Sequence, residues 1–284
     1  MRKVKLIECP RDAMQGWKKI IPAREKAAYI NRLLQVGFDT IDFGSFVSPK
    51  AVPQMADTRE VLALLDLPEN GTKLLAIAAN YRGAEEASVY ESIRYIGFPF
   101  SVSETFQLRN TNSTITESLE RVADIQNLCV KTGKELVVYI SMGFGNPYGD
   151  AWDEEQVLTW VHRLVEMDIG IISLADTVGL ADPAQVYSLT RYLVESLPGT
   201  EVGVHLHSRP DNWLEKMEAA LKAGCLRFDG ALKGIGGCPM AGDVLVGNMN
   251  TEQMIPYLRD KGLLPEINTE ILKECTAMAG KIFT

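Results

Sequence analysis

The sequence lacks the cysteine patterns that define disulfide scaffolds and zinc ribbons. Its five cysteines are odd in number, widely scattered and without a Cys-x-x-Cys pair, which indicates reduced thiols. The chain also lacks any apolar run near the ~20 residues that a membrane-spanning helix needs. No signal-type apolar segment follows its basic start. We therefore expect a soluble, cytoplasmic protein.

The sequence also has no excess of basic residues. Lys and Arg total 29 against 37 Asp and Glu, which gives a formal net charge of −8. This balance argues against a nucleic-acid surface, although it leaves room for a local basic pocket around an anionic ligand. Linkers, internal repeats and low-complexity segments are also absent, so we expect an ordinary globular protein.

What the sequence does contain is a regular alternation of short β-branched runs with longer amphipathic stretches. The runs are predicted as strands, over residues 4–9, 40–43, 74–78, 98–103, 136–142, 170–174, 202–206 and 227–231. The stretches are predicted as helices, over residues 23–35, 55–65, 83–90, 115–131, 154–167, 183–196, 211–223, 251–261 and 269–280. Strands that alternate with helices pair in parallel, and eight such units favour a (β/α)8 TIM barrel. We expect one barrel domain over 1–284, with 265–284 as a C-terminal helical extension.

Histidine is scarce, which makes its distribution informative. Two of the three histidines, His205 and His207, lie two residues apart at the end of a predicted strand. Side chains at positions i and i+2 project from the same strand face, so the two imidazoles can bind one metal ion. Taken alone, the pair fits an ordinary polar strand end equally well.

Further polar residues follow the predicted strands, at the end of a barrel where active sites lie. Asp12 follows the first strand, and Asn248 comes after the last. Two imidazoles, a carboxylate and an amide carbonyl form a mixed nitrogen and oxygen set that suits Mg²⁺ or Mn²⁺, with Fe²⁺ and Zn²⁺ left open. A turn role for Asp12 and for Asn248 also stays open.

A glycine-rich loop, 234–239, follows the last predicted strand. Its glycines lack the spacing of a dinucleotide fingerprint, which argues against a nucleotide site. A flexible lid that carries Cys238 over a bound substrate is one interpretation. A small buried thiol is the other, because most lone cysteines behave in that way.

Several segments carry a family resemblance, in order, over nearly the whole chain: Arg11-Asp12, 45–50, 52–55, 176–179, His205-x-His207, 236–239 and Gly247-Asn248. Together they resemble 3-hydroxy-3-methylglutaryl-CoA lyase. That family belongs to the metal-dependent lyases and Claisen condensing enzymes built on a TIM barrel. Arg-Asp or His-x-His alone would be a weak signal, whereas the combination is specific.

The resemblance implies roles for individual residues. The implied metal ligands are Asp12, His205, His207 and Asn248. The implied catalytic residues are Arg11 as the cation at the thioester carbonyl, Cys238 in proton transfer, Asp42 as an active-site carboxylate, and His205 as a base besides being a ligand. The implied substrate contacts are Arg11, Gln15, Ser45, Asn110 and Ser173.

The implied reaction is retro-Claisen cleavage of 3-hydroxy-3-methylglutaryl-CoA, or of a close 3-hydroxy-acyl-CoA, to acetyl-CoA and acetoacetate. The implied cofactor is Mg²⁺ or Mn²⁺. The implied partners are the acyl-CoA substrate and a second copy of this chain, without nucleic acid or membrane. Candidate contacts to the CoA phosphates are Lys18, Lys19, Lys50, Arg82 and Arg109.

Two alternatives to this reaction stay open. The first is a Claisen-type synthase that condenses an acyl-CoA with a 2-oxo acid. Such enzymes typically carry a further domain after the barrel, whereas about 25 residues remain here. The second is a non-catalytic barrel that keeps the metal site.

Two departures from the family pattern bear on the substrate. The family's first-strand glutamate aligns with Ile7, whereas Glu8 lies one position later and points to the opposite strand face unless a bulge intervenes. Ser208 stands where an acidic residue usually follows the second histidine. Both changes leave the predicted metal residues in place, so they affect the choice of substrate more than the reaction class.

Overall fold

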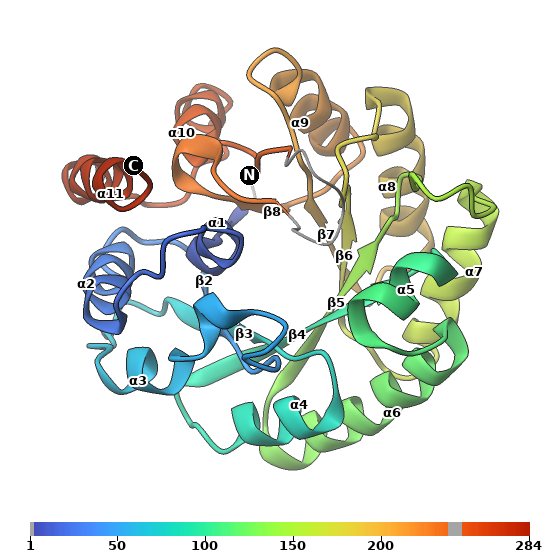
Figure 1. The fold of residues 1–284 in the computed structure, drawn as a ribbon. Helices are drawn as coiled ribbons and strands as arrows, with labels where there is room; N and C mark the ends of the chain where they lie inside the picture. The colour runs from blue at the N-terminus through green and yellow to red at the C-terminus, as the bar shows by residue number, and fades with distance from the viewer. Residues whose placement is uncertain (1–2, 238–245) are drawn as a thin grey trace.

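The protein is a closed barrel of parallel strands surrounded by helices, as seen down the barrel in Figure 1. The computed structural model describes residues 3–237 and 246–284. The strands pair in sequence order around the ring. They are β1 (Lys5–Glu8), β2 (Thr40–Ser45), β3 (Lys73–Ile77), β4 (Ile93–Ser101), β5 (Glu135–Ser141), β6 (Ile171–Ala175), β7 (Glu201–His205) and β8 (Arg227–Gly230). The prediction of a (β/α)8 TIM barrel is confirmed.

The described helices are α1 (Pro10–Gln15), α2 (Ala23–Leu33), α3 (Thr58–Ala63), α4 (Tyr81–Ser88), α5 (Glu104–Thr111), α6 (Ile115–Thr132), α7 (Glu154–Val165), α8 (Pro183–Ser196), α9 (Trp213–Lys222), α10 (Thr251–Asp260) and α11 (Thr269–Ile282), with the 3-10 turns η1 (Pro53–Met55) and η2 (Leu232–Gly234). The longer helices surround the strand ring, whereas α1 lies inward of α2 (Figure 1). Within the described ranges, none of these helices combines the length and apolarity needed to cross a membrane.

Local sequence signals explain why the longer helices begin where they do. In α8, Pro183 occupies the first turn and Asp182 forms a capping box with Gln185, so the helix begins at the predicted residue. In α6, Thr114 forms a capping box with Glu117, and Gly133 ends the helix in the left-handed conformation.

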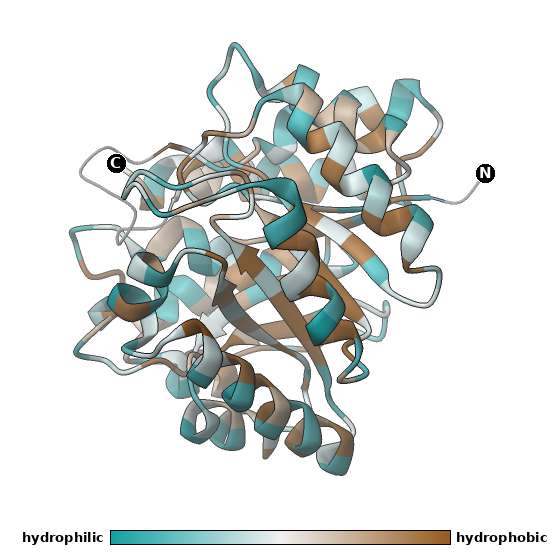
Figure 2. Ribbon diagram, turned by 90° about the vertical axis from the view of Figure 1, so that its right-hand side faces the viewer, coloured by the Kyte–Doolittle hydropathy of each residue, from teal (hydrophilic) through white to brown (hydrophobic). Residues whose placement is uncertain are grey.

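Apolar residues divide between two zones, and the side view in Figure 2 shows the hydrophobic strands at the centre of the molecule. The larger zone lies between the strands and the buried faces of the helices. The smaller zone lies inside the barrel, where alternate residues of the strands point inward. Its members are Leu75, Ile77, Tyr95, Val137, Tyr139 and Ile171.

Three elements differ from the sequence-based prediction. The short helices α1 and α5 occupy segments predicted as loops, because Pro10 starts the first and the Ser103 hydroxyl caps the second. Strand β4 begins at Ile93 rather than at residue 98. Its middle carries Gly97, where a Cβ atom would lie 2.5 Å from Ile77 Cδ1, and a glycine there weakens the strand pattern.

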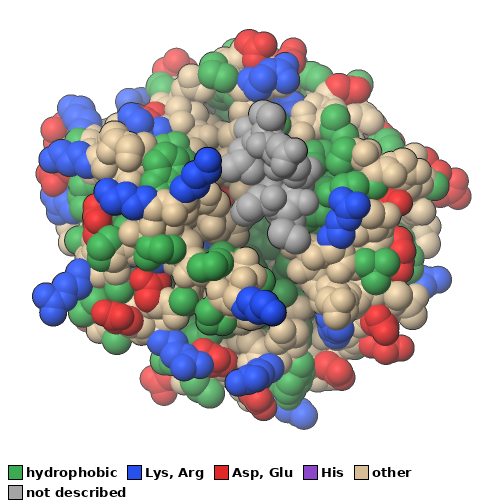
Figure 3. Space-filling view, in the orientation of Figure 1, with side chains coloured by type: hydrophobic (Ala, Val, Ile, Leu, Met, Phe, Trp, Pro, Cys, Tyr) green, Lys and Arg blue, Asp and Glu red, His purple; other side chains and the backbone are tan. Residues whose placement is uncertain are grey.

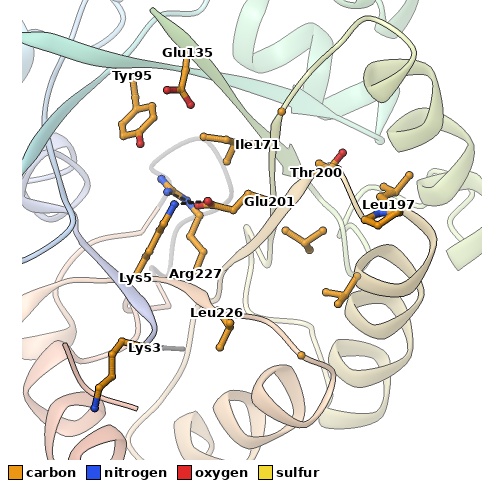
Figure 4. Close-up of a pocket in the computed structure, with 16 residues that line it drawn as sticks. Lys3, Lys5, Tyr95, Glu135, Ile171, Leu197, Thr200, Glu201, Leu226 and Arg227 are labelled. Atoms are coloured by element: carbon orange, nitrogen blue, oxygen red, sulfur yellow. Dashed lines mark hydrogen bonds and ion pairs between the residues drawn. The ribbon is translucent and has the colours of Figure 1, made fainter. Parts of the chain in front are cut away.

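A cavity of about 470 Å³ lies at the amino-terminal end of the barrel, and charged residues are prominent in its lining (Figure 4). The Glu201 carboxylate accepts hydrogen bonds from Lys5 and, at 3.0 Å, from Nη1 of Arg227. Gly203 leaves room for the Arg227 stem, because a Cβ atom at this position would lie 2.8 Å from Arg227 Cδ. The predicted site residues gather at the opposite, carboxyl end of the strands.

Candidate active site

A cavity of about 250 Å³ opens at the carboxyl ends of the strands. Figure 3 views the molecule from the same side as Figure 1 and shows a hollow near the centre of this face, with Lys and Arg side chains spread around it. Predicted site residues that line the cavity are Arg11, Asp12, Gln15, Ser45, Asn110, His205 and His207. The rest of the wall is mainly apolar, as is usual for small-molecule sites.

The two histidines are held by their Nδ1 atoms. Nδ1 of His205 lies 3.0 Å from a carboxylate oxygen of Asp229, and Nδ1 of His207 lies 2.7 Å from the backbone oxygen of Val246. Each acceptor fixes its imidazole with the proton on Nδ1, which leaves Nε2 as the donor atom for a ligand. Both rings are buried and tilted toward each other, with centroids 5.3 Å apart.

Asp12 accepts hydrogen bonds on both carboxylate oxygens. Its Oδ1 accepts from Arg11 at 3.0 Å and from Gln15 at 2.8 Å. Its Oδ2 accepts from the side chain of Asn248 at 2.7 Å and from the backbone N–H of Gly237 at 3.2 Å. Burial raises the pKa of this carboxyl group. Arg11, the two histidines and the Asn248 hydrogen bond lower it by a larger amount, so the pKa lies well below the usual range. Asp12 is therefore a stable anion.

Ligand atoms of Asp12, His205 and His207 all lie within 4.8 Å of one another. The side chain of Asn248 joins this cluster through Asp12, and its Nδ2 also donates to the backbone oxygen of Ile235 at 2.9 Å. Because both amide hydrogens are used, Oδ1 of Asn248 is left as an acceptor. Two imidazole nitrogens, a carboxylate and an amide oxygen suit a divalent ion of the Mg²⁺, Mn²⁺, Fe²⁺ or Zn²⁺ type, so these residues fit a metal.

Arg11 lies beside this cluster and is anchored by Asp42 of β2. Its Nε donates to both carboxylate oxygens, at 3.0 and 3.2 Å, and its Nη2 donates at 2.5 Å. Burial raises the pKa of Asp42 to about 6, which leaves the carboxylate ionised at neutral pH. Burial disfavours the charged guanidinium, but Asp42 and Asp12 more than offset this and raise the pKa of Arg11. Among the described residues, one N–H on each Nη atom has no partner and can bind a substrate oxygen.

The glycine loop packs directly against these residues. A Cβ atom at Gly236 would lie 2.4 Å from Asn248 Nδ2 and 2.9 Å from the backbone oxygen of Asp12, so only glycine fits. Its φ of +118° also favours glycine. The predicted lid residue Cys238 lies in 238–245, outside the described residues, so its role stays a prediction.

The remaining predicted residues lie at different depths. Ser45 at the end of β2 and Asn110 in the last turn of α5 both line the cavity. Ser173 does not line it, since it is fully buried in β6 and faces the barrel interior beside Tyr139. A direct substrate contact by Ser173 therefore stays a prediction from the family resemblance.

Sequence reasoning missed two residues next to the histidines. Asp229 lies in β8, 24 positions from His205, and orients its ring. Tyr139 lies in β5, and its ring packs edge-on against the His205 imidazole, with the ring centroids 5.8 Å apart. A carboxylate in the middle of the predicted strand 227–231 was the available signal for Asp229.

Glu8 lies on the outer face of β1. Its carboxylate accepts a hydrogen bond from the Leu232 backbone N–H at 2.7 Å and lies 2.6 Å from the Thr251 hydroxyl. The pairing of β1 with β8 runs without a bulge through Glu8, so the side chain points away from the barrel interior. Glu8 thus does not take the place of the glutamate that the family has at the position of Ile7.

Buried Glu8 leads to an expected pH dependence of stability. Burial raises its pKa from the ordinary 4.5 to about 8. The folded protein therefore holds this proton more tightly than the unfolded chain, and the resulting stability is complete below pH 4.5 and lost as the pH rises to 8. We expect Glu8 to lower the free energy of unfolding by roughly 3 kcal/mol between pH 5 and pH 8. Urea denaturation at the two pH values measures this change.

The matched variant is Glu8→Gln, which keeps an acceptor for the Leu232 N–H and a donor for Thr251 but cannot ionise. We expect it to lose this part of the pH dependence and to be the more stable protein at pH 8. The same pH slope in Glu8→Gln and in the unmodified chain would contradict the assignment.

The fold and the site define a class: a (β/α)8 barrel with a buried cluster at its mouth that is able to hold a divalent metal ion. The family model described as HMGL-like matches residues 3–278. The chain belongs to this family, and the resemblance to the 3-hydroxy-3-methylglutaryl-CoA lyases is confirmed.

Curated relatives and solved structures agree on this family. The chain is 33% identical over 266 residues to hydroxymethylglutaryl-CoA lyase YngG of Bacillus subtilis, covering 93% of this chain and 87% of that protein. It is 33% identical over 282 residues to the 3-hydroxy-3-isohexenylglutaryl-CoA/hydroxy-methylglutaryl-CoA lyase of Pseudomonas aeruginosa, covering 99% and 91%. A solved HMG-CoA lyase of Acinetobacter baumannii, in complex with coenzyme A and 3-methylmalate, superimposes with a TM-score of 0.90 at 28% identity, covering 98% and 92%.

Proposed function

We propose that this protein is a divalent-metal-dependent carbon–carbon lyase that cleaves 3-hydroxy-3-methylglutaryl-CoA, or a close 3-hydroxy-acyl-CoA, to acetyl-CoA and acetoacetate. The observation that carries the proposal is the cluster of Asp12, His205, His207 and Asn248 at the mouth of the barrel, with Arg11 beside it. Its placement in a cavity of about 250 Å³ gives room for the acyl group. Membership of the HMGL-like family supports the reaction class.

Asp12, His205, His207 and Asn248 would hold the metal ion. When bound, the ion lowers the pKa of the substrate's tertiary hydroxyl group and orients its oxygens. Asp12 supplies negative charge, and the imidazoles supply Nε2 atoms that Asp229 and Val246 keep in the required tautomer. We propose Mg²⁺ or Mn²⁺ as the ion, since the site mixes two nitrogen with two oxygen donors and leaves positions for substrate oxygens.

Arg11 stabilises the charge that develops during cleavage. Loss of the hydroxyl proton turns that carbon into the ketone of acetoacetate as the carbon–carbon bond breaks. The electron pair of that bond moves to the acetyl-CoA fragment and places negative charge on the thioester oxygen. The two N–H groups of Arg11 that Asp42 and Asp12 leave open can donate to this oxygen. Because Asp42 holds the guanidinium in place, little reorganisation is needed at that moment.

Proton transfers complete the reaction. A base must take the hydroxyl proton, and the family resemblance proposes His205, which lines the cavity. Because Asp229 holds the proton on Nδ1, His205 would accept the hydroxyl proton on Nε2 in place of binding the ion. The acetyl-CoA enolate must then gain a proton at carbon, and Cys238 is proposed as its donor by the family resemblance. A second copy of the chain as partner and a cytoplasmic location complete the proposal. The four described cysteines are buried and free, which supports a reducing compartment.

The test is release of acetoacetate from 3-hydroxy-3-methylglutaryl-CoA by the full chain, with Mn²⁺ or Mg²⁺ and again after chelation. We expect turnover with either ion and its loss with the chelator. The same preparation with acetyl-CoA and a panel of 2-oxo acids tests the synthase alternative. No cleavage of any 3-hydroxy-acyl-CoA by protein that binds stoichiometric Mn²⁺ would favour the non-catalytic barrel.

A further inference from the structure

We infer that Lys216 is a positioning residue for the metal site, whose buried ammonium group holds the backbone that carries both imidazoles. The inference rests on the proposed function, because it concerns the same site. Lys216 belongs to α9 on the outside of the barrel and does not line the cavity, so any effect on the site must pass through the residues that it contacts.

Nothing within α9 itself favours a buried lysine at position 216. It lies in the first turns of α9, near the end where the helix dipole disfavours a cation. Its side chain is only 1% exposed, although lysine is almost never fully buried unless it is paired. Burial of an ammonium group in such a place requires partners that compensate for lost water.

Those partners lie directly after the ends of β6 and β7, two neighbouring strands next to the site. Nζ of Lys216 donates to Oδ2 of Asp176 at 2.8 Å and to the backbone oxygen of His207 at 2.9 Å. The backbone N–H of Asp176 in turn donates to the oxygen of His205 at 3.0 Å. The Lys216–Asp176 pair therefore binds the carbonyl groups of both histidines.

The pair takes over where regular strand pairing stops. The ladder between β6 and β7 ends with Ala175 opposite His205, so β6 offers no further partner to the carbonyl group of His207. A buried carbonyl group without a donor is costly, and Lys216 supplies the donor. Asp176 is itself fixed, because its Oδ1 accepts from the Ala181 backbone N–H at 3.0 Å.

The opposite edge of the segment is held by backbone bonds, besides the contact of the His207 ring with Val246. The N–H of Met249 donates to Leu206 at 3.2 Å, and the N–H of Ser208 donates to Gly247 at 2.8 Å. These bonds bring Asn248 beside His207. Contacts with Lys216 on one edge and with 247–249 on the other therefore restrain the backbone of His207 from both sides. Removal of Lys216 frees one edge and lets the Nε2 atom move relative to Asp12.

The experiment is Lys216→Met, with Lys222→Met as the matched control on the same helix. The Lys222 side chain is 71% exposed, and its Nζ lies 3.5 Å from a carboxylate oxygen of Glu218 on the same helix. Apo-protein is titrated with Mn²⁺, and free Mn²⁺ is followed by electron paramagnetic resonance. We expect Lys216→Met to weaken Mn²⁺ binding by about 10- to 100-fold, as is typical when a partner that orients metal ligands is removed. Lys222→Met should bind as the unmodified chain does.

A second pair of variants keeps the test decisive if Lys216→Met does not fold, since it leaves Asp176 buried without its cation. Asp176→Asn keeps Lys216 on His207, whereas Asp176→Asn with Lys216→Met removes both charges. We expect the double variant to bind Mn²⁺ about 10-fold more weakly than Asp176→Asn. Equal Mn²⁺ affinities of Lys216→Met and Lys222→Met, or of the double variant and Asp176→Asn, would overturn the role of Lys216 and leave the proposed function standing. Absence of Mn²⁺ binding by the unmodified chain would instead remove the proposed function and this inference with it.

Discussion

Arg11→Met is expected to keep a bound divalent ion and to lose nearly all turnover. The guanidinium group lies beside the metal cluster, is fixed by Asp42, and has N–H groups left for a substrate oxygen. Removal of a preorganised donor to a developing oxyanion typically costs about 10²- to 10³-fold in kcat. Arg11 also carries a full charge, so we expect a loss at the upper end of this range or beyond. Initial rates of acetoacetate release at saturating Mn²⁺ measure it.

The controls for Arg11 separate charge, geometry and folding. Arg11→Lys keeps a positive charge but not the planar fork that binds Asp42, so it should retain only part of the activity. Arg11→Met with Asp42→Asn removes the buried, unpaired carboxylate that the single variant leaves behind. Mn²⁺ titration must show that each variant still binds the ion. Near-normal turnover of Arg11→Met would remove Arg11 from the mechanism.

His207→Ala is expected to abolish both metal binding and cleavage. The variant removes an imidazole from the cluster in which His207, His205 and Asp12 place ligand atoms within 4.8 Å of one another. Loss of a residue that merely orients a ligand costs about 10- to 100-fold in metal affinity, so loss of a ligand should cost more. We expect Mn²⁺ affinity to fall by more than 100-fold and turnover to fall to background.

The chain offers a matched control for this experiment in its third histidine. His162 lies on α7, where its ring packs edge-on against Tyr192, and it does not line the cavity. His162→Ala should bind Mn²⁺ and cleave the substrate as the unmodified chain does. Metal-dependent turnover that survives in His207→Ala would show that the ion is held elsewhere.

The fold was largely predictable because its signals are local. Alternating runs of two periodicities predict strands and helices, and Asp182-Pro183 fixes the start of α8 without help from the rest of the chain. Helices α1 and α5 escaped prediction, since each is short and has little amphipathic pattern. The start of β4 escaped for a related reason: Gly97 interrupts its pattern, and the neighbouring strands pair across it.

The candidate site was only partly predictable. Its ligand types could be read from His205-x-His207 and from Asp12, because their spacing and order need no knowledge of packing. The partners that hold these residues could not. Asp229 contacts His205 from the neighbouring strand, and Lys216 reaches the His207 backbone from a helix outside the barrel. Neither residue stands out by spacing, and each acquires its role from contacts alone.

By itself, the sequence determined the alternation that makes a barrel, the strand that carries both imidazoles, and the end of the barrel at which polar residues collect. Periodicity, capping and side-chain chemistry are properties of neighbouring residues, so they survive without a fold. Only the tertiary structure decided which groups meet. Asp12 and Asn248 are 236 positions apart and share a hydrogen bond of 2.7 Å. Glu8 is one position from the family's glutamate and faces the other way, because closure of the barrel fixes which face of each strand points inward.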